Sequence, residues 1–326
     1  MVYVALHLGA GTHSHENYVR YKRLAKKACE LAISEVKAGK SVGEAAVSAC
    51  RVLEDSPLVN AGYGSQLDID GDVACDAGYI DTDFVRPACV SGITRSHPIS
   101  TAKALSQSYK APSLPLERHR PVHIHGQENV ESYLGIEGDV DLKSPEATRV
   151  WEKWKRLEQN AQVPSSVPED TVGVIVGDKE HMAIATSSGG PILKSKGRVG
   201  PVATYGCGFS LQKGSRTIGV CTTGCGEDII TSRLSGRVLE ALAEAQEPDT
   251  GISALFDKLQ GSFQSSPVTL GCLAVVYEEG HVSIYSLHKA PSMISAVKSG
   301  HDKTNIQWLQ KDPNTVVSSI QIYRER

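Results

Sequence analysis

The stretch Glu169-Asp170-Thr171-Val172-Gly173 leads directly into a strand-like apolar run that continues to Val176. A threonine hydroxyl is a weak nucleophile at neutral pH, and a free α-amine on the same residue can accept its proton. An α-amine titrates at about 7.7 to 8.0, which suits that role near working pH. The amine exists only if the peptide bond between Asp170 and Thr171 is cut. An Asp-Thr pair before a strand is most often an ordinary loop end, so other residues must decide.

The composition indicates a globular protein without a charge signature for a polyanionic partner. The 326 residues are 40% hydrophobic, enough to bury a large core. The net charge of −3 gives no reason to expect nucleic acid or anionic lipid as a partner. No apolar stretch approaches the roughly 20 residues of a membrane span, so we expect no membrane partner. The apolar segment 1–8 is too short for a signal peptide, and it predicts a buried first strand in a cytoplasmic protein.

The cysteine and histidine patterns do not predict a metal site. The eight cysteines are scattered without a CxxC pair, which favours free buried thiols. His119, His123 and His125 are spaced like metal ligands, but they stand in a basic, proline-bounded segment with no matching cysteine or aspartate cluster. We therefore expect no metal at these residues.

Apolar spacing predicts two consecutive helices near the N-terminus. Residues 18–38 carry apolar side chains at helical spacing and stop at Gly39, a residue suited to ending a helix. Ser41 and Glu44 form a capping-box pattern that starts the second helix at once. Further helices are predicted at 100–107, 144–159 and 227–245, and strands at 88–93, 171–176, 182–187 and 217–222.

Turn signals predict two hairpins and one linker. Asp70-Gly71 and Glu279-Gly280 each stand between strand-like runs, and the second hairpin, 269–287, is expected to be the last element. The segment 163–170 contains two prolines and two serines, which predicts a linker accessible to cleavage. Strands in both halves with helices grouped in runs favour an α+β sandwich of layers over a doubly wound parallel sheet.

A second group of motifs consists of glycine turns that carry polar side chains. Thr223 and Gly224 stand at a predicted strand-to-helix junction, where exposed N–H groups suit a developing oxyanion. Arg198 stands between glycines and is a candidate clamp for a carboxylate, because a guanidinium binds one bidentately. Each motif alone would be read as a simple turn or a surface residue. Together they need a common explanation, and they lie at 60–64, 187–190, 197–200, 206–208 and 222–227.

These motifs resemble those of the N-terminal-nucleophile hydrolases of the plant-type asparaginase family, and within it the threonine aspartase (taspase) branch. The resemblance covers nearly the whole chain, and its motifs follow one another in the family's order. They are the segments 9–14, 53–62, 75–77, 170–173, 187–190, 197–200 and 224–227. The Ser188 hydroxyl stands where asparaginases usually have threonine, which matches the taspase branch.

The resemblance implies a four-layer αββα fold and synthesis as an inactive precursor. Self-cleavage before Thr171 would yield an α chain, 1–170, whose linker covers about 160–170, and a β chain, 171–326. The two would remain one structural domain, an αβ heterodimer, and we expect a dimer of such units. Animal taspases carry a long basic insertion that targets them to the nucleus. This chain lacks the insertion and has only Lys153, Lys155 and Arg156 as a basic cluster. The cytoplasm is therefore the expected location, with the nucleus as the alternative.

The resemblance also implies roles for individual residues. Thr171 would be the nucleophile in both self-cleavage and turnover, with Ser188 as the second active-site hydroxyl. Thr223 and Gly224 would polarise the substrate carbonyl. The substrate-binding residues would be Asn60, which positions the nucleophile, Arg198, which binds a carboxylate, and Gly226, which lines the pocket. The loop 53–63 resembles a segment that holds a structural sodium ion in asparaginases; we expect no cofactor beyond such an ion.

Position 201 bears on the choice of substrate. Asparaginases of the family have an aspartate there, which accepts the substrate's α-ammonium, whereas this chain has Pro201, with no side-chain acceptor. A buried ammonium left unpaired is costly, but a substrate whose nitrogen is already in a peptide bond carries no such charge. We therefore expect a threonine endopeptidase that cuts protein or peptide substrates after aspartate, as at Asp170. The alternatives are an L-asparaginase or isoaspartyl peptidase, and a scaffold that never matures.

Overall fold

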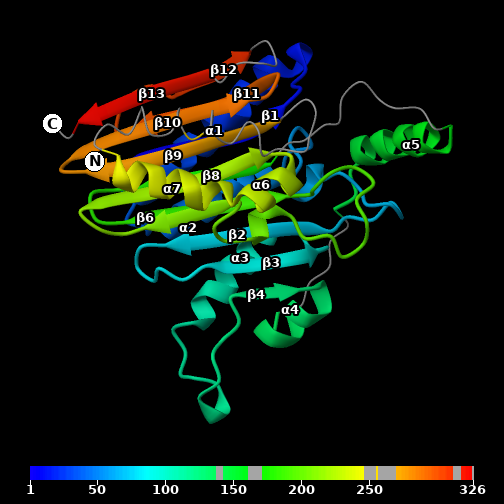
Figure 1. Cartoon of the computed structure of the whole chain (residues 1–326), viewed down its shortest axis with the longest axis horizontal. Coiled ribbons are helices and arrows are strands. Elements are labelled where there is room, and N and C mark those ends of the chain that lie inside the picture. Colours follow the sequence, from blue (N-terminus) through cyan, green and yellow to red (C-terminus); the bar gives the residue numbers. More distant parts are fainter. Residues whose placement is uncertain (137–141, 161–170, 246–254, 256–268, 311–316, 325–326) are drawn as a thin grey trace.

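The computed structural model describes residues 1–136, 142–160, 171–245, 255, 269–310 and 317–324 (Figure 1). Asp170 and the predicted linker up to it, from 161 on, lie outside the described residues. The helices are α1 (Tyr18–Lys37), α2 (Val42–Glu54), α3 (Pro98–Ser108), α4 (Gln127–Leu134), α5 (Pro145–Gln159), α6 (Gly226–Ser232) and α7 (Leu234–Glu244). Short 3-10 turns are η1 (His15–Asn17), η2 (Gly62–Gly64), η3 (Pro115–Glu117) and η4 (Pro201–Ala203).

The described strands form two sheets. The first is ordered β12-β11-β1-β5-β6-β2-β3-β4 and the second β13-β10-β9-β8-β7. All neighbours are antiparallel except β3 and β4. The first sheet contains β1 (Tyr3–Gly11), β2 (Cys75–Asp81), β3 (Ala88–Ile93), β4 (His123–His125), β5 (Val172–Gly177), β6 (Met182–Ser188), β11 (Ser292–Ser299) and β12 (Asn305–Gln310). The second contains β7 (Phe209–Gln212), β8 (Arg216–Gly224), β9 (Leu270–Glu278), β10 (His281–Lys289) and β13 (Val317–Arg324).

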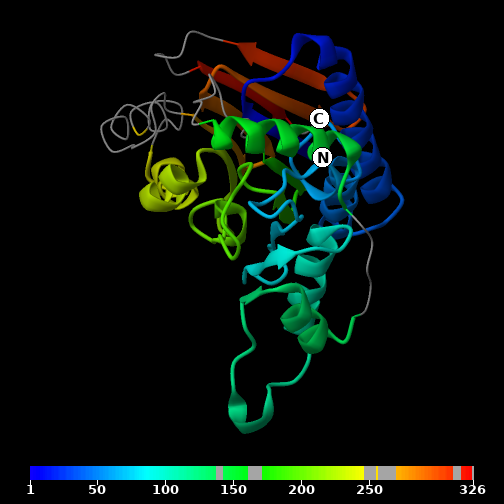
Figure 2. The ribbon, with the colours of Figure 1, turned by 90° about the vertical axis from the view of Figure 1, so that its right-hand side faces the viewer.

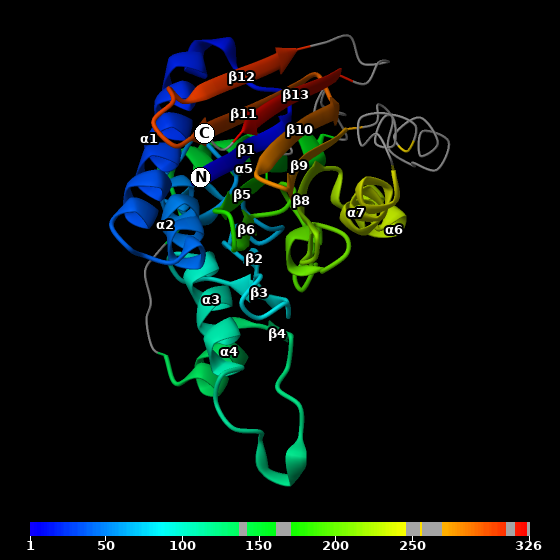
Figure 3. The ribbon, with the colours of Figure 1, turned by 90° about the vertical axis from the view of Figure 1, so that its left-hand side faces the viewer.

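The elements stack as helices, sheet, sheet and helices. Buried side chains of α1, α2 and α3 pack on the outer face of the first sheet. Ala5, Ile175 and Ile184 of the first sheet meet Leu273 and other apolar residues of the second between the sheets. Side chains of α6 and α7 cover the outer face of the second sheet. Figure 3 shows the two helical layers on opposite sides of the strands. The predicted αββα sandwich is therefore confirmed.

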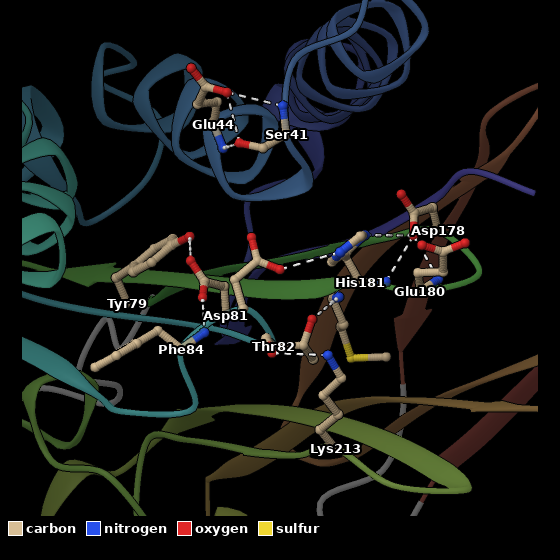
Figure 4. Close-up of polar contacts among 12 residues, drawn as sticks. Ser41, Glu44, Tyr79, Asp81, Thr82, Phe84, Asp178, Glu180, His181 and Lys213 are labelled. Carbon is tan, nitrogen blue, oxygen red and sulfur yellow. Dashed lines mark hydrogen bonds and ion pairs between the residues drawn. The ribbon is translucent and has the colours of Figure 1, made fainter. Parts of the chain in front are cut away.

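The helix signals near the N-terminus are confirmed. α1 ends at Lys37, and Gly39 follows with a φ of +94°, a left-handed conformation that glycine adopts without strain. α2 begins after Ser41, whose hydroxyl accepts from the Glu44 N–H while the Glu44 carboxylate accepts from the Ser41 N–H (Figure 4). The capping box thus fixes the start of the helix that packs against β5 and β6.

Three sequence predictions need correction. The Asp70-Gly71 turn exists, but the segment 66–69 does not pair with β2, because its backbone bonds to Leu193 and Lys194 instead. The predicted helix 227–245 is broken at Arg233, whose φ is 51°. The second hairpin, β9 and β10, is confirmed, but it is not the last element. It is followed by β11, which pairs with β1, and by β12 and β13.

Polar contacts fasten the end of the β5–β6 hairpin that lies opposite Thr171 (Figure 4). Asp178, in the turn after β5, accepts the backbone N–H groups of Glu180 and His181. Thr82, after β2, accepts the Met182 N–H at the start of β6. These bonds hold the register of β5 and β6, which places the start of β5 beside the end of β6.

No helix among the described residues combines the length and the apolar character needed to cross a lipid bilayer.

Candidate active site

One small cavity collects most of the predicted site residues. Its volume is about 30 Å³, comparable with the space taken by one water molecule. Thr171 stands at the start of β5 and Ser188 at the end of the neighbouring strand β6, and both are buried. Six predicted residues line the cavity, namely Asn60, Thr171, Ser188, Arg198, Gly224 and Gly226, together with Gly190, Pro191, Pro201 and Glu227.

The two hydroxyl groups are in direct contact. Thr171 Oγ1 donates to Ser188 Oγ at 3.1 Å, and the Gly190 N–H donates to the same oxygen at 3.1 Å. The contact follows from strand pairing, because Val172 lies opposite Ser187 in the antiparallel β5–β6 ladder. Ser188 therefore orients the Thr171 hydroxyl by accepting its hydrogen bond.

Asn60 braces the turn that follows Ser188. Its amide nitrogen donates to the Gly190 carbonyl at 2.8 Å, and its amide oxygen accepts from the Gln66 N–H at 2.9 Å. Its backbone carbonyl accepts from the Gly189 N–H at 2.9 Å. A Cβ added to Gly189 would stand 2.4 Å from the Asn60 oxygen, so this turn needs glycine there. A chain of hydrogen bonds thus links Asn60 to Thr171 through Gly190 and Ser188.

Thr223 and Gly224, at the end of β8, differ in how they face the cavity. Gly224 lines it with a φ of +119°, and an added Cβ would stand 2.1 Å from the Thr269 carbonyl oxygen. Thr223 is fully buried and is not a lining residue; its Oγ1 accepts from the Ala10 N–H at 3.1 Å. A hydroxyl that accepts one bond still has its own proton to donate. The Thr223 hydroxyl can therefore still donate a hydrogen bond to a substrate carbonyl, which is the role predicted from the sequence.

The Arg198 guanidinium is held along one edge by Glu227, in the first turn of α6. Nε donates to Oε1 at 3.1 Å and Nη2 to Oε2 at 3.2 Å. Nη1 lies on the other edge, and a Cβ added to Gly190 would stand 3.0 Å from it. A Cβ added to Gly226 would stand 2.2 Å from Nη2, so glycine there leaves room for the guanidinium. The outer edge, Nη1 and Nη2, can still bind a carboxylate bidentately.

Pro201 lies beside the Arg198 guanidinium on the cavity wall, as the first residue of η4. The nearby carboxylate of Asp76 is buried and engaged, since its two oxygens accept the N–H groups of Gly92 at 3.2 Å and Gly200 at 2.6 Å. Asp76 is not a lining residue. Pro201 therefore offers only an apolar ring to the cavity, and the carboxylate that does line it, Glu227, is paired with Arg198.

Two buried basic residues stand behind the cavity. Burial lowers the pKa of His7 on β1 to about 3, so this imidazole is neutral at working pH. Its Nε2 stands 2.3 Å from where a Cβ on Gly173 would be, which requires glycine there. Burial also lowers the pKa of Lys194, whose ammonium donates to the Ala74 carbonyl.

Comparison with known proteins identifies the family. A family model described as asparaginase matches residues 1–307. The plant-type L-asparaginase of Pyrococcus abyssi is 30% identical over 251 residues, 72% of this chain and 77% of that protein. The chain belongs to the plant-type asparaginase family. The isoaspartyl peptidase/L-asparaginase of Mus musculus is 29% identical over 287 residues, 85% and 82% of the two chains. That of Danio rerio is 30% identical over 250 residues, 76% and 77% of the chains.

Within this asparaginase-family site, sequence reasoning did not anticipate the parts played by Glu227, Asp76 and His7. Glu227 ends the predicted motif 222–227 and stands in the first turn of a helix, a position that favours an acidic side chain. The sequence therefore contained a local signal for the position of Glu227. The partner of Asp76 is a backbone N–H 124 residues away, which no local pattern indicates.

The loop 53–63 packs closely on Gly64. The carbonyl oxygens of Ser56 and Val59 lie 2.5 and 2.2 Å from where a Cβ on Gly64 would stand, so this position needs glycine. Among the described residues no cluster of three or more His, Cys, Asp or Glu side chains could hold a metal ion. A structural sodium ion at this loop stays a prediction.

Replacing Glu227 with glutamine is expected to raise KM for an aspartate-containing substrate about two- to fivefold, with kcat nearly unchanged. The side chain of Glu227 is 66% exposed, and an exposed ion pair contributes at most about 1 kcal/mol. Without the charge, Arg198 is less often held with its outer edge toward the substrate. Steady-state kinetics measures both constants. A fall in KM would mean instead that Glu227 competes with the substrate carboxylate.

Proposed function

We propose that this asparaginase-family protein is a threonine endopeptidase that cuts itself between Asp170 and Thr171 and then hydrolyses polypeptides after aspartate. The observation that carries the choice of substrate is Pro201 beside Arg198 on the cavity wall. Arg198 supplies a fork for the aspartate side chain, while the proline offers no acceptor for a free α-ammonium. A peptide-bonded nitrogen is neutral and leaves no unpaired charge.

The chemistry of self-cleavage uses the Thr171–Ser188 pair. Thr171 Oγ1 attacks the carbonyl carbon of residue 170, the C–N bond breaks, and the hydroxyl proton passes to the nitrogen, which becomes the free α-amine of Thr171. Water then hydrolyses the resulting ester, which frees the carboxylate of residue 170 and restores the Thr171 hydroxyl. In later cycles the α-amine takes the hydroxyl proton and returns it to the leaving amine. Thr223 and Gly224 are proposed to stabilise the oxyanion in both reactions.

The proposal includes an opening of the site on maturation. The cavity volume of about 30 Å³ is far below the 300 to 1,000 Å³ of typical ligand sites. We propose that separation of the chain at Thr171 opens this space. Limited proteolysis or hydrogen exchange at 187–200 before and after maturation would measure the change.

A second candidate is hydrolysis of free L-asparagine or isoaspartyl peptides. The names of the curated relatives favour it over the endopeptidase, since they are L-asparaginases and isoaspartyl peptidases. One feature of the site also permits it, because the Glu227 carboxylate lines the cavity and could accept an ammonium. That carboxylate is already paired with Arg198, which is why we place this activity second.

Replacing Pro201 with aspartate is expected to raise ammonia release from L-asparagine at least tenfold. The new carboxylate would pair with the α-ammonium, for which the native cavity offers only the Glu227 carboxylate that Arg198 already holds. Pro201→Asn is the matched control, because it has the same shape without the charge. An unchanged rate in Pro201→Asp, with self-cleavage intact, would contradict the ammonium argument.

One experiment separates the two activities. Intact-mass spectrometry follows cleavage at Thr171, and the matured protein is then given a peptide with one Asp-Gly bond and, separately, L-asparagine. Peptide cleavage without ammonia release supports the endopeptidase. Ammonia release without peptide cleavage makes it an asparaginase. The αβ heterodimer, its pairing into a dimer and a cytoplasmic or nuclear location stay predictions.

A further inference from the structure

Two further cavities lie next to the active-site cavity. Their volumes are about 170 and about 510 Å³, and they stand between the loop 57–66 and the N-terminal half of α5. Asn60 lines both the active-site cavity and the smaller of these two. Pro57, Leu58 and Glu146 line both the smaller and the larger cavity. The three spaces are therefore neighbours in a row, and we call the outer two the α5 groove.

α5 is a firm wall for this groove. It lies across one end of the two sheets, as Figures 1 and 2 show from two sides. Its first turn is capped by Ser144, whose hydroxyl accepts from the Ala147 N–H at 3.1 Å. Trp151 donates to the Asp68 carbonyl at 2.8 Å and packs its ring against Gly71. Because these contacts anchor the helix on the turn 68–72, its groove-facing residues are held in place.

The lining changes character along the groove. The smaller cavity, next to Asn60, is lined mainly by apolar side chains that include Leu58, Val59 and Val150. The larger cavity beyond it is polar and includes Arg20 and Arg149. An occupant that extends from the active site would place apolar side chains first and solvated, polar groups further out.

We propose that the α5 groove binds the polypeptide segment that precedes the cleaved aspartate, with an apolar side chain two or three residues before that aspartate. The inference rests on the proposed endopeptidase function, because a free amino acid would have no atoms to place there. The substrate class is thus an extended polypeptide, held by the groove on the amino-terminal side of the cut bond.

Two observations indicate that the groove binds the substrate on the amino-terminal side of the cut bond. In the precursor the segment that precedes the cut bond begins at α5, since only ten residues separate Asn160 from Thr171. The chain's own sequence before that bond is Val167-Pro168-Glu169-Asp170. It carries apolar residues at the third and fourth positions, which match the apolar lining of the smaller cavity. A substrate cleaved in trans would present the same order of groups to the same walls.

Peptides of two lengths test the proposal with the matured wild-type protein. The long peptide has the sequence of residues 163–176, and the short one begins at Glu169. We expect kcat/KM to be at least tenfold higher for the long peptide, with the difference mainly in KM. A third peptide with serine in place of Val167 and Pro168 should behave like the short one. Equal kcat/KM for the long and short peptides would overturn the proposal.

A pair of variants places the effect on α5. Val150→Asp puts a charge on the wall of the smaller cavity, and Gln159→Asp puts the same charge at an exposed position of the same helix. We expect the long-to-short ratio of kcat/KM to fall toward one in Val150→Asp and to keep its wild-type value in Gln159→Asp. Self-cleavage at Thr171, followed by intact mass, reports that each variant folds. A ratio that Val150→Asp leaves unchanged would contradict the groove.

The proposal can be judged even if the endopeptidase function fails. If the matured protein releases ammonia from L-asparagine and cuts no peptide, the proposed function is wrong. The long and short peptides are then tested as inhibitors of that reaction. Competitive inhibition by the long peptide, at least tenfold stronger than by the short one, supports the groove. Equal or absent inhibition by the two peptides overturns it.

Discussion

Replacing Thr171 with alanine is expected to leave the chain uncut and to abolish turnover of every substrate. Alanine has no oxygen to attack a carbonyl, and without cleavage no α-amine forms at position 171. Loss of a nucleophile that works as a unit with its base costs on the order of 10⁴-fold or more in kcat. Intact-mass spectrometry and the peptide and ammonia assays measure the two effects.

Thr171→Ser is the matched control for this result. It keeps a hydroxyl at the same place beside Ser188 and removes only a methyl group, so we expect slow but complete self-cleavage. An active, uncut Thr171→Ala protein would rule out the N-terminal nucleophile. Cleavage of that variant at Thr171 would show that another group breaks the bond.

Replacing Arg198 with methionine is expected to lower kcat/KM for an aspartate-containing peptide by about 10² to 10³-fold. The substrate carboxylate would enter the site without its charged partner. Self-cleavage should be slowed and still reach completion, because the bond to be cut is held next to Thr171 by the chain itself. Kinetics with an aspartate peptide and with its asparagine analogue measures the loss. If this variant prefers the aspartate peptide over its asparagine analogue as strongly as the wild type does, Arg198 does not recognise the carboxylate.

Gly226→Ala tests the same contact through geometry. The added Cβ would stand 2.2 Å from Arg198 Nη2, the far end of a flexible side chain, so the guanidinium can move while the fold persists. We expect its kcat/KM to fall in the same direction as in Arg198→Met. Gly214→Ala is the control, because an added Cβ there meets only the Arg216 carbonyl oxygen at 3.6 Å.

Much of the secondary structure could be predicted because its signals are local. α1, α2 and β3 follow from apolar spacing, a capping box and β-branched residues within short windows, and they lie close to where the sequence places them. The hairpin at Asp70-Gly71 was wrong for a tertiary reason. Its first segment finds backbone partners in the chain that follows Ser188, and a turn signal contains no information about such a partner.

From the sequence by itself followed the candidate nucleophile Thr171, the glycine motifs around it and an α+β sandwich of layers, while the αββα order of the layers came from the family resemblance. The threonine and the glycine motifs lie in short windows whose residue types restrict backbone conformation or chemistry. Only the tertiary structure decided that Glu227 holds one edge of the Arg198 guanidinium, that the Thr223 hydroxyl accepts the Ala10 N–H, and that α5 walls a groove beside Asn60. These contacts join segments far apart in the chain, so they depend on strand order and register.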